Sequence, residues 1–186
     1  SGTSIALGSG TSVFNAGTLT FNSAGSVTIS ETSSLDLVGI NTANSADLDS
    51  TAGVSDATAV SVDVSGLLDV SGTSIALGSG TSVFNAGTLT FNSTGSVTVS
   101  EDSSLDLVGT NTAGSASLVS VAGVSDAGAV SVNVTGLLDV SGTSIALGSG
   151  TSVFNAGTLT FNSAGSVTIS ETSSLDLVGI NTANSA

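Results

Sequence analysis

The chain has 186 residues, a formal net charge of −14, and no Lys, Arg, His, Cys, Met, Trp, Tyr or Pro. The usual base for a serine nucleophile, the Schiff-base lysine and the nitrogen and thiolate metal ligands are therefore all missing. Negative charge with no compensating cation also repels nucleic acid and anionic lipid. We expect neither an enzyme nor a nucleic-acid-binding protein.

The sequence is a tandem repeat. Residues 1–70 return as residues 71–140 with 11 differing positions, and residues 141–186 match residues 1–46 throughout. Each unit of such an array buries its apolar face against the next, so that shape and length are the product. We expect two full repeats and a partial third (1–70, 71–140 and 141–186), forming one continuous piece of a longer array.

Short runs of alternating apolar and polar residues follow one another along the first repeat. They predict β-strands at residues 5–7, 19–21, 27–29, 35–37 and 60–64. Clusters rich in Gly, Ser and Asn predict tight turns between them, namely Gly8-Ser9-Gly10, Asn22-Ser23-Ala24-Gly25 and Asn41-Thr42-Ala43-Asn44. The gap between residues 37 and 60 is expected to hold a weaker strand around Leu48 and a longer loop.

This spacing is typical of an all-β parallel β-solenoid, in which short strands and turns form coils that stack on one another. About three coils fit each 70-residue repeat, divided as 67–88, 89–111 and 112–136, and a four-coil division is the alternative. Coils ~4.8 Å apart give an advance of ~14 Å per repeat. Inward aliphatic residues are expected to stack in columns with Phe14 and Phe21 as large plugs, and Asn15 and Asn22 to stack as amide ladders.

No apolar run approaches the ~20 residues of a membrane helix, and no basic segment precedes an apolar one near residue 1. We therefore expect neither a membrane span nor a signal peptide in this sequence. Uncapped solenoid ends expose apolar cross-sections and strand edges. Self-association, end to end or laterally into fibres, is the expected consequence.

Three phrases carry a family resemblance: GLLDVSGTSIAL at 66–77, FNAGTLTF at 84–91 and SSLDLVG at 103–109. They resemble repeats of the giant filamentous-haemagglutinin-like adhesins of Gram-negative bacteria. The resemblance implies a right-handed parallel β-helix shaft without catalytic residues. It further implies export across the outer membrane to the cell surface or the extracellular space, and attachment to host or neighbouring cells.

Carboxylates are the remaining groups with functional chemistry. Glu31 and Asp36 are the candidate for a glycosidase-like acid pair, which needs two carboxyls at a defined separation in a groove. Asp47, Asp49 and Asp69 are weak candidates for calcium, because the predicted coils place like charges on adjacent strands. Solvated surface charge is the favoured explanation, because the second copy has Ser117 and Val119 in place of Asp47 and Asp49. We therefore expect no catalytic site, no metal site and no cofactor, with Ca²⁺ at these aspartates as the alternative.

Two other functions stay open at this stage. One is a calcium-stabilised string of small β-sandwich domains in a long adhesin, with one domain per repeat. The other is an ice-binding solenoid, suggested by Thr18-Leu19-Thr20 and its copy Thr88-Leu89-Thr90. Ice binding requires a flat face with matched threonines on many successive coils.

Overall fold

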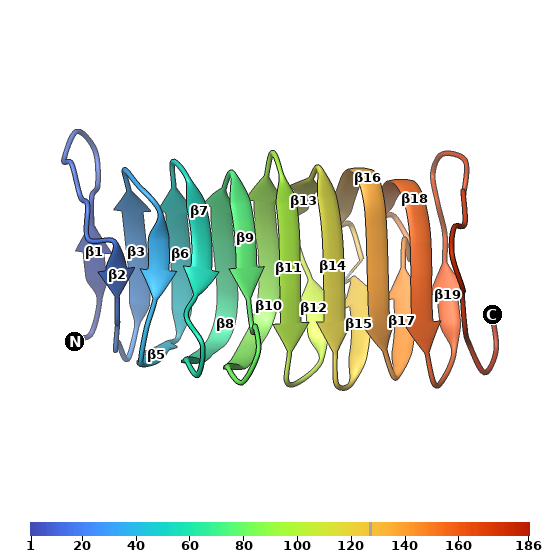
Figure 1. The fold of residues 1–186 in the computed structure, drawn as a ribbon, viewed down its shortest axis with the longest axis horizontal. Coiled ribbons are helices and arrows are strands. Elements are labelled where there is room, and N and C mark those ends of the chain that lie inside the picture. The colour runs from blue at the N-terminus through green and yellow to red at the C-terminus, as the bar shows by residue number, and fades with distance from the viewer. Residues whose placement is uncertain (127) are drawn as a thin grey trace.

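A computed structural model describes residues 1–126 and 128–186. They form one 19-stranded parallel sheet wound into a solenoid of about eight turns of roughly 21 residues, with the termini at opposite ends (Figure 1). The predicted all-β parallel solenoid is confirmed. The β-sandwich alternative is wrong, because sandwiches are built from antiparallel strands and every strand pairing of the described residues is parallel.

The strands of the described residues are β1 (Ile5–Leu7), β2 (Thr18–Leu19), β3 (Ser26–Glu31), β4 (Leu35–Leu37), β5 (Ile40–Ala43), β6 (Ser45–Ser50), β7 (Gly53–Asp56), β8 (Ser61–Gly72), β9 (Ser74–Leu77), β10 (Val83–Ser93), β11 (Ser96–Glu101), β12 (Leu105–Leu107), β13 (Thr110–Ala113), β14 (Ser115–Ser120), β15 (Gly123–Asp126), β16 (Ser131–Gly142), β17 (Ser144–Leu147), β18 (Val153–Ser163) and β19 (Val167–Ile169). None of the described residues lies in a helix that is long and apolar enough to cross a membrane.

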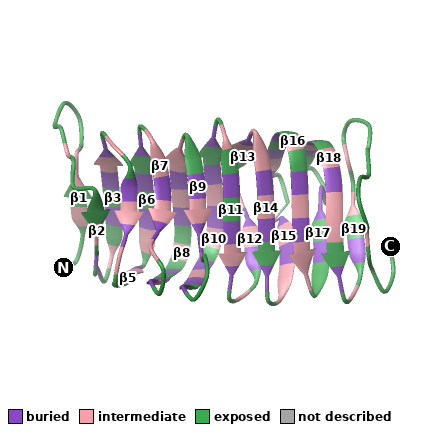
Figure 2. Ribbon diagram, in the orientation of Figure 1, coloured by how far each residue is buried: buried purple, intermediate pink, exposed green. Residues whose placement is uncertain are grey.

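Alternation along each strand separates the interior from the surface. In β3, Val27 and Ile29 are buried whereas Ser26 and Thr28 are exposed, and the same stripes recur along the solenoid (Figure 2). Inward residues stack in register from turn to turn, as in the column of Ile29, Leu48, Val70 and Phe91. The result is one continuous hydrophobic core along the axis.

Three stacks of strands run along the molecule. Stack A contains β1, β3, β6, the second halves of β8 and β10, β13 and the first halves of β16 and β18. Stack B contains β2, β4, β7, β9, β11, β14 and the second halves of β16 and β18. Stack C contains β5, the first halves of β8 and β10 and, above β10, β12, β15, β17 and β19. The chain passes through the three stacks in succession in each turn.

The repeat and the turn are out of step by about a third of a turn, since 70 residues at roughly 21 per turn make about three and a third turns. Three successive pairings lead from Ile29 to Phe91 within stack A, and the next eight residues bring the chain to Val99 in stack B. Val99 is the equivalent of Ile29 one repeat later. The "about three coils" expected from the sequence are thus about three and a third, and consecutive copies present the same strand on successive stacks.

One predicted turn is wrong. Asn41-Thr42-Ala43-Asn44 reads as a turn cluster, but Ile40–Ala43 forms strand β5 and Asn41 is buried. The predicted long loop between residues 37 and 60 likewise contains three strands, of which β6 is the weaker strand expected around Leu48. Several inward positions between residues 37 and 60 are polar or small, as at Asn41, Ala43 and Ala46. The sequence therefore lacks the regular alternation of hydrophobic and polar residues that would predict strands here.

The phenylalanines are plugs, as predicted. Phe84 and Phe91, the copies of Phe14 and Phe21 in the second repeat, are completely buried. Phe14 itself is only partly buried, because it lies in the first turn with no turn beneath it.

Candidate functional site

Glu101 is a buried acid at the end of β11, with an exposed fraction of 1%. Its Oε1 accepts hydrogen bonds from the Ala86 N–H (2.9 Å) and the Ser103 hydroxyl (2.8 Å). Its Oε2 is buried without a partner among the described residues. Burial raises the pKa of Glu101 to about 7, and the charges of Asp102 and Asp106 add to the rise against the effect of the two hydrogen bonds.

The predicted acid pair is not assembled into a site. Glu31 points into the interior, where it accepts hydrogen bonds from the Ala16 N–H and the Ser33 hydroxyl. Asp36 occupies the outward position of β4 and accepts a hydrogen bond from the Ser55 hydroxyl at 3.0 Å. A glycosidase needs both carboxyls in one substrate groove, and these two face different environments.

A second buried carboxylate, Asp56, is fully satisfied by the next turn. It accepts hydrogen bonds from the N–H groups of Gly78 (2.9 Å) and Ser79 (3.4 Å) and from the Ser79 hydroxyl (3.2 Å). We call this set of donors the glycine-serine nest. Gly78 must be glycine, since its φ is 75° and a Cβ would lie 1.9 Å from the Ser100 carbonyl oxygen.

The nest recurs one repeat later, where Asp126 accepts hydrogen bonds from the Gly148 N–H (2.8 Å), the Ser149 N–H (3.4 Å) and the Ser149 hydroxyl (3.0 Å). Sequence reasoning missed this pairing. Its signal is an Asp that closes one strand and a Gly-Ser-Gly that closes the strand one turn later. Consecutive N–H groups of this kind form a concavity that favours anions.

Buried asparagines cap the bends between paired strands. The Asn111 Oδ1 accepts the Phe91 N–H at 3.0 Å, and its Nδ2 donates to the Val108 carbonyl at 2.9 Å. Asn41 makes the corresponding contacts in the first repeat. The amide ladders predicted for Asn15 and Asn22 are not formed. The Asn15 side chain accepts a hydrogen bond from the Ser33 hydroxyl, and the Asn22 backbone forms an isolated parallel β-bridge with Thr42.

Surface hydrogen bonds link successive turns in one direction. The hydroxyl lies on the later turn and the Asn or Asp oxygen on the earlier one, as in Ser55 to Asp36, Ser33 to Asn15, Thr112 to Asn92, Thr172 to Asn155, Ser71 to Asp49 and Ser125 to Asp106. This pattern explains how a surface rich in Ser, Thr, Asn and Asp joins its turns without Lys or Arg.

Two of the three calcium candidates, Asp47 and Asp69, lie side by side on neighbouring strands. Asp47 on β6 pairs in register with Asp69 on β8, as predicted, while Asp49 pairs with Ser71 and accepts its hydroxyl. Burial raises the pKa of Asp47, and the charges of Asp49 and Asp69 add to it. Burial followed by the charge of Asp49 raises the pKa of Asp69. The described residues contain no group of three or more acidic side chains placed to hold a metal ion.

The outward threonines do not form an array. Along stack B the outward column that begins at Thr18 continues with Asp36, Ser55, Ala76, Thr98, Ser117, Asp139 and Thr160. Threonine therefore recurs only every fourth or third turn in this column. No observation in this column favours ice binding.

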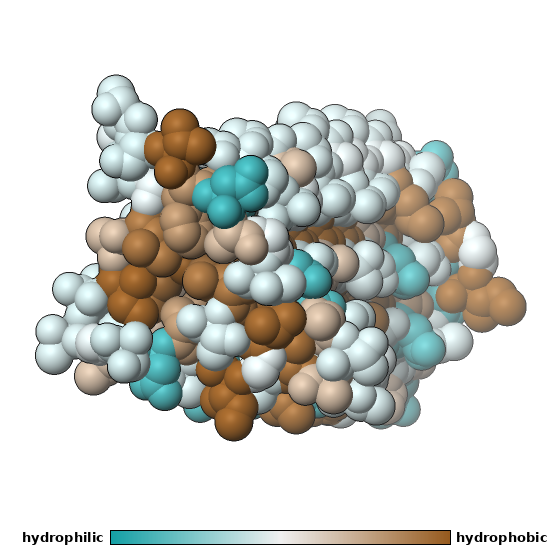
Figure 3. All heavy atoms as spheres, turned by 60° about the vertical axis from the view of Figure 1, so that its left-hand side comes forward, coloured by the Kyte–Doolittle hydropathy of each residue, from teal (hydrophilic) through white to brown (hydrophobic). Residues whose placement is uncertain are grey.

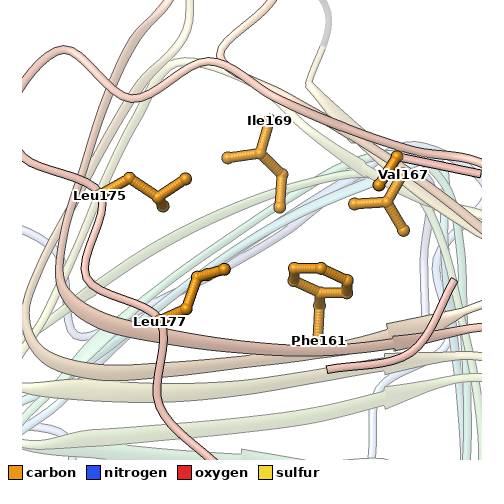
Figure 4. Close-up of a pocket in the computed structure, with 6 residues that line it drawn as sticks. Phe161, Val167, Ile169, Leu175 and Leu177 are labelled. Atoms are coloured by element: carbon orange, nitrogen blue, oxygen red, sulfur yellow. The ribbon is translucent and has the colours of Figure 1, made fainter. Parts of the chain in front are cut away.

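A hollow of 220 Å³ opens at the C-terminal end of the solenoid, lined by Phe161, Val167, Ile169, Leu175, Leu177 and Ala186. The side chains of the five labelled residues, Phe161, Val167, Ile169, Leu175 and Leu177, converge on a common space (Figure 4). Leu177 is 46% exposed, whereas its copies Leu37 and Leu107 are fully buried under the following turn. The hollow is an uncovered cross-section of the core, and the side chains that line it are all apolar.

Comparison with known proteins gives no relative: no family model, curated protein or solved structure matches this chain.

Proposed function

We propose that this protein is the structural shaft of a bacterial fibre displayed at the cell surface or released from it, and that the fibre attaches cells to host or neighbouring cells. The observation that carries the proposal is the absence of a break between repeats. The boundary between residues 70 and 71 lies inside β8, and that between 140 and 141 lies inside β16. Stacking therefore passes through each boundary without a linker, as a load-transmitting rod requires.

The surface chemistry supports the same role. Serine, threonine, asparagine and aspartate link the turns on the outside, and no Lys or Arg offers a site for trypsin-like proteases. Net charge of one sign keeps such rods soluble. The extracellular location and the adhesive use come from the resemblance to filamentous-haemagglutinin-like repeats.

Adhesion is tested with beads that carry the folded chain. The matched control is Leu118→Asp, which places a charge in the fully buried core and disrupts the solenoid. We expect the folded chain, and not the disrupted variant, to retain beads on cultured epithelial cells or on bacteria of the source strain after washing. Equal retention of both, or retention of neither, would contradict the adhesive role.

The shaft is tested separately by electron microscopy of the purified chain. Eight turns at a spacing of ~4.8 Å predict a rod ~38 Å long with strands perpendicular to its axis. Compact globules joined by flexible linkers would contradict the shaft.

A further inference from the structure

Two asparagines of the chain begin an Asn-X-Thr sequence, which is an acceptor sequence for N-linked sugars. One is Asn92, at the start of residues 92–94 (Asn-Ser-Thr), and the other is Asn133, at the start of residues 133–135 (Asn-Val-Thr). No other asparagine of the sequence has Ser or Thr two positions later. The fold decides whether these two are presented to a modifying enzyme.

Both acceptor sequences belong to the second repeat alone. The first and third repeats have Ala24 and Ala164 at the place of Thr94, so the hydroxyl is missing there. The first repeat has Asp63 at the place of Asn133, so the amide is missing. The chain thus contains copies of these strands that cannot be modified in the same way.

The strands hold each acceptor sequence with its reactive groups outside. Asn92 and Thr94 are exposed while Ser93 between them is buried, and the exposed Asn133 and residue 135 flank a buried residue 134 in the same manner. Alternate residues of an extended chain lie on one side of it. The amide and the hydroxyl of each sequence therefore face the solvent together.

The amide nitrogens of both asparagines are free. The buried asparagines use this atom, as where the Asn111 Nδ2 donates to the Val108 carbonyl. No described residue accepts a hydrogen bond from the Nδ2 of Asn92 or of Asn133. The Asn92 Oδ1 accepts the Thr112 hydroxyl at 2.6 Å, which holds the oxygen against the next turn.

The two asparagines lie on one face of the solenoid. Asn92 pairs in register with Thr112, and Thr112 pairs with Asn133, all in stack A. Two turns separate the asparagines by ~9.6 Å along the axis, with only the short Thr112 side chain between them. Figure 3 shows that residues of intermediate hydropathy, as Ser and Thr are, cover the upper part of one side of the molecule. Small side chains of this kind leave room for a bulky group on an exposed asparagine.

We propose that Asn92 and Asn133 are N-glycosylated, each receiving a sugar at its Nδ2 from a phosphate-activated donor. The Nδ2 forms a bond to C1 of the sugar while the bond from C1 to the phosphate oxygen breaks. The phosphate leaves with the electron pair of that bond, and the transferase takes up one proton of the Nδ2. The Oδ1 is not consumed, so the hydrogen bond from Thr112 to Asn92 is compatible with the sugar. The inference goes beyond the proposed shaft and does not depend on its adhesive use.

The test is mass spectrometry of the protein purified from the source strain. A protease that cleaves after Asp and Glu is used, because the chain has no Lys or Arg. It releases Asn92 in peptide 70–101 and Asn133 in peptide 127–139. Peptide 140–171 is the internal control, since it differs from 70–101 only by Ala164 for Thr94 and Ile169 for Val99.

We expect sugar on peptides 70–101 and 127–139 and none on peptide 140–171. A single hexose on each asparagine would identify a nucleotide-activated donor, whereas a larger oligosaccharide would identify a lipid-linked one. The absence of sugar from either of the first two peptides, or equal modification of the control peptide, would overturn the proposal.

Two variants produced in the same strain separate the acceptor sequence from its surroundings. Thr94→Ala should remove the sugar from Asn92 and leave it on Asn133, and Ala164→Thr should add a sugar at Asn162. Sugar that persists on Asn92 in Thr94→Ala would contradict the assignment. Circular dichroism of the glycosylated chain should show a folded β-structure, because both asparagines are exposed. A modified chain that is unfolded would overturn the placement of the sugars on the solenoid. Failure of cell adhesion alone would leave all these outcomes unaffected.

Discussion

The buried carboxylate of Glu101 accepts a hydrogen bond of 2.9 Å from the Ala86 N–H on the turn below. Its other oxygen has no partner among the described residues. The ionised form is therefore incompletely compensated, and the solenoid favours the protonated form.

The raised pKa of Glu101 predicts that the stability of the folded chain depends on pH. The pKa of Glu101 is about 7 in the folded chain, against an ordinary value of 4.5, so the folded state binds the proton more tightly than the unfolded state does. The stabilisation is complete below about pH 4.5 and is lost as the pH rises through about 7. Urea unfolding should show a free energy of unfolding lower by about 1 to 3 kcal/mol at pH 8 than at pH 5.

Glu101→Gln separates this acid from the general repulsion of a chain of net charge −14. The variant should show a smaller difference between pH 5 and pH 8, since the amide does not titrate. An unchanged difference would mean that Glu101 is not the responsible group.

Asp126→Asn should lower the free energy of unfolding by about 1 to 3 kcal/mol, because the nest of Gly148 and Ser149 loses its charged acceptor. Asp139→Asn is the matched control, since Asp139 makes no side-chain hydrogen bond to the described residues. Its effect is expected within about 0.5 kcal/mol. Equal losses in the two variants, measured by urea unfolding at pH 7, would refute the structural role of the nest.

Asp69→Asn should stabilise the chain by up to about 1 kcal/mol at pH 7, because Asp69 lies in register with Asp47 and like charges opposite one another repel. Asp139→Asn is again the control, as Asp139 pairs in register with Ser117. The gain should disappear at pH 3, where the carboxyls are protonated. A gain that persists at pH 3 would point to packing rather than to charge.

Calcium should leave the melting temperature unchanged. Calcium takes six to eight oxygen ligands, whereas here two carboxylates lie in register and the Asp49 carboxylate is already bonded by Ser71. Thermal melts in CaCl₂ and in EDTA measure the effect. A rise in calcium that EDTA reverses and Asp69→Asn abolishes would establish the site.

The offset of about a third of a turn between copies can be measured by spin labels, since the chain has no cysteine of its own. Thr28, Thr98 and Thr168 are equivalent and exposed, and about three and a third turns separate neighbours by ~16 Å along the axis. Cysteines at Thr28 and Thr98 should be further apart than half the distance between cysteines at Thr28 and Thr168. The axial separation doubles from the first pair to the second, whereas both pairs are also separated sideways, because the three residues lie on different stacks. A distance of half would indicate a whole number of turns per repeat.

Much of the fold could be predicted from local pattern. The alternation in Val27-Thr28-Ile29 and Leu35-Asp36-Leu37 predicts strands that the structure confirms, and a 70-residue period predicts stacking. The register of Asp47 beneath Asp69 also follows from coil length alone. Strand β5 could not be found this way, since its inward residues Asn41 and Ala43 are stabilised by contacts with neighbouring turns rather than by hydrophobic alternation.

The sequence by itself therefore determined that the chain forms short strands, stacks its repeats and carries no imidazole, amine or thiol. The tertiary structure decided which copies of a residue are buried and which of them enter a strand. Val13 and Val83 have identical neighbours along the chain, yet only Val83 enters a strand, and Leu37 is buried where Leu177 is exposed. A solenoid turn is completed by the turns below and above it, so the offset between copies, the filling of the nests and the burial of each residue depend on contacts about 20 residues apart, which local sequence does not specify.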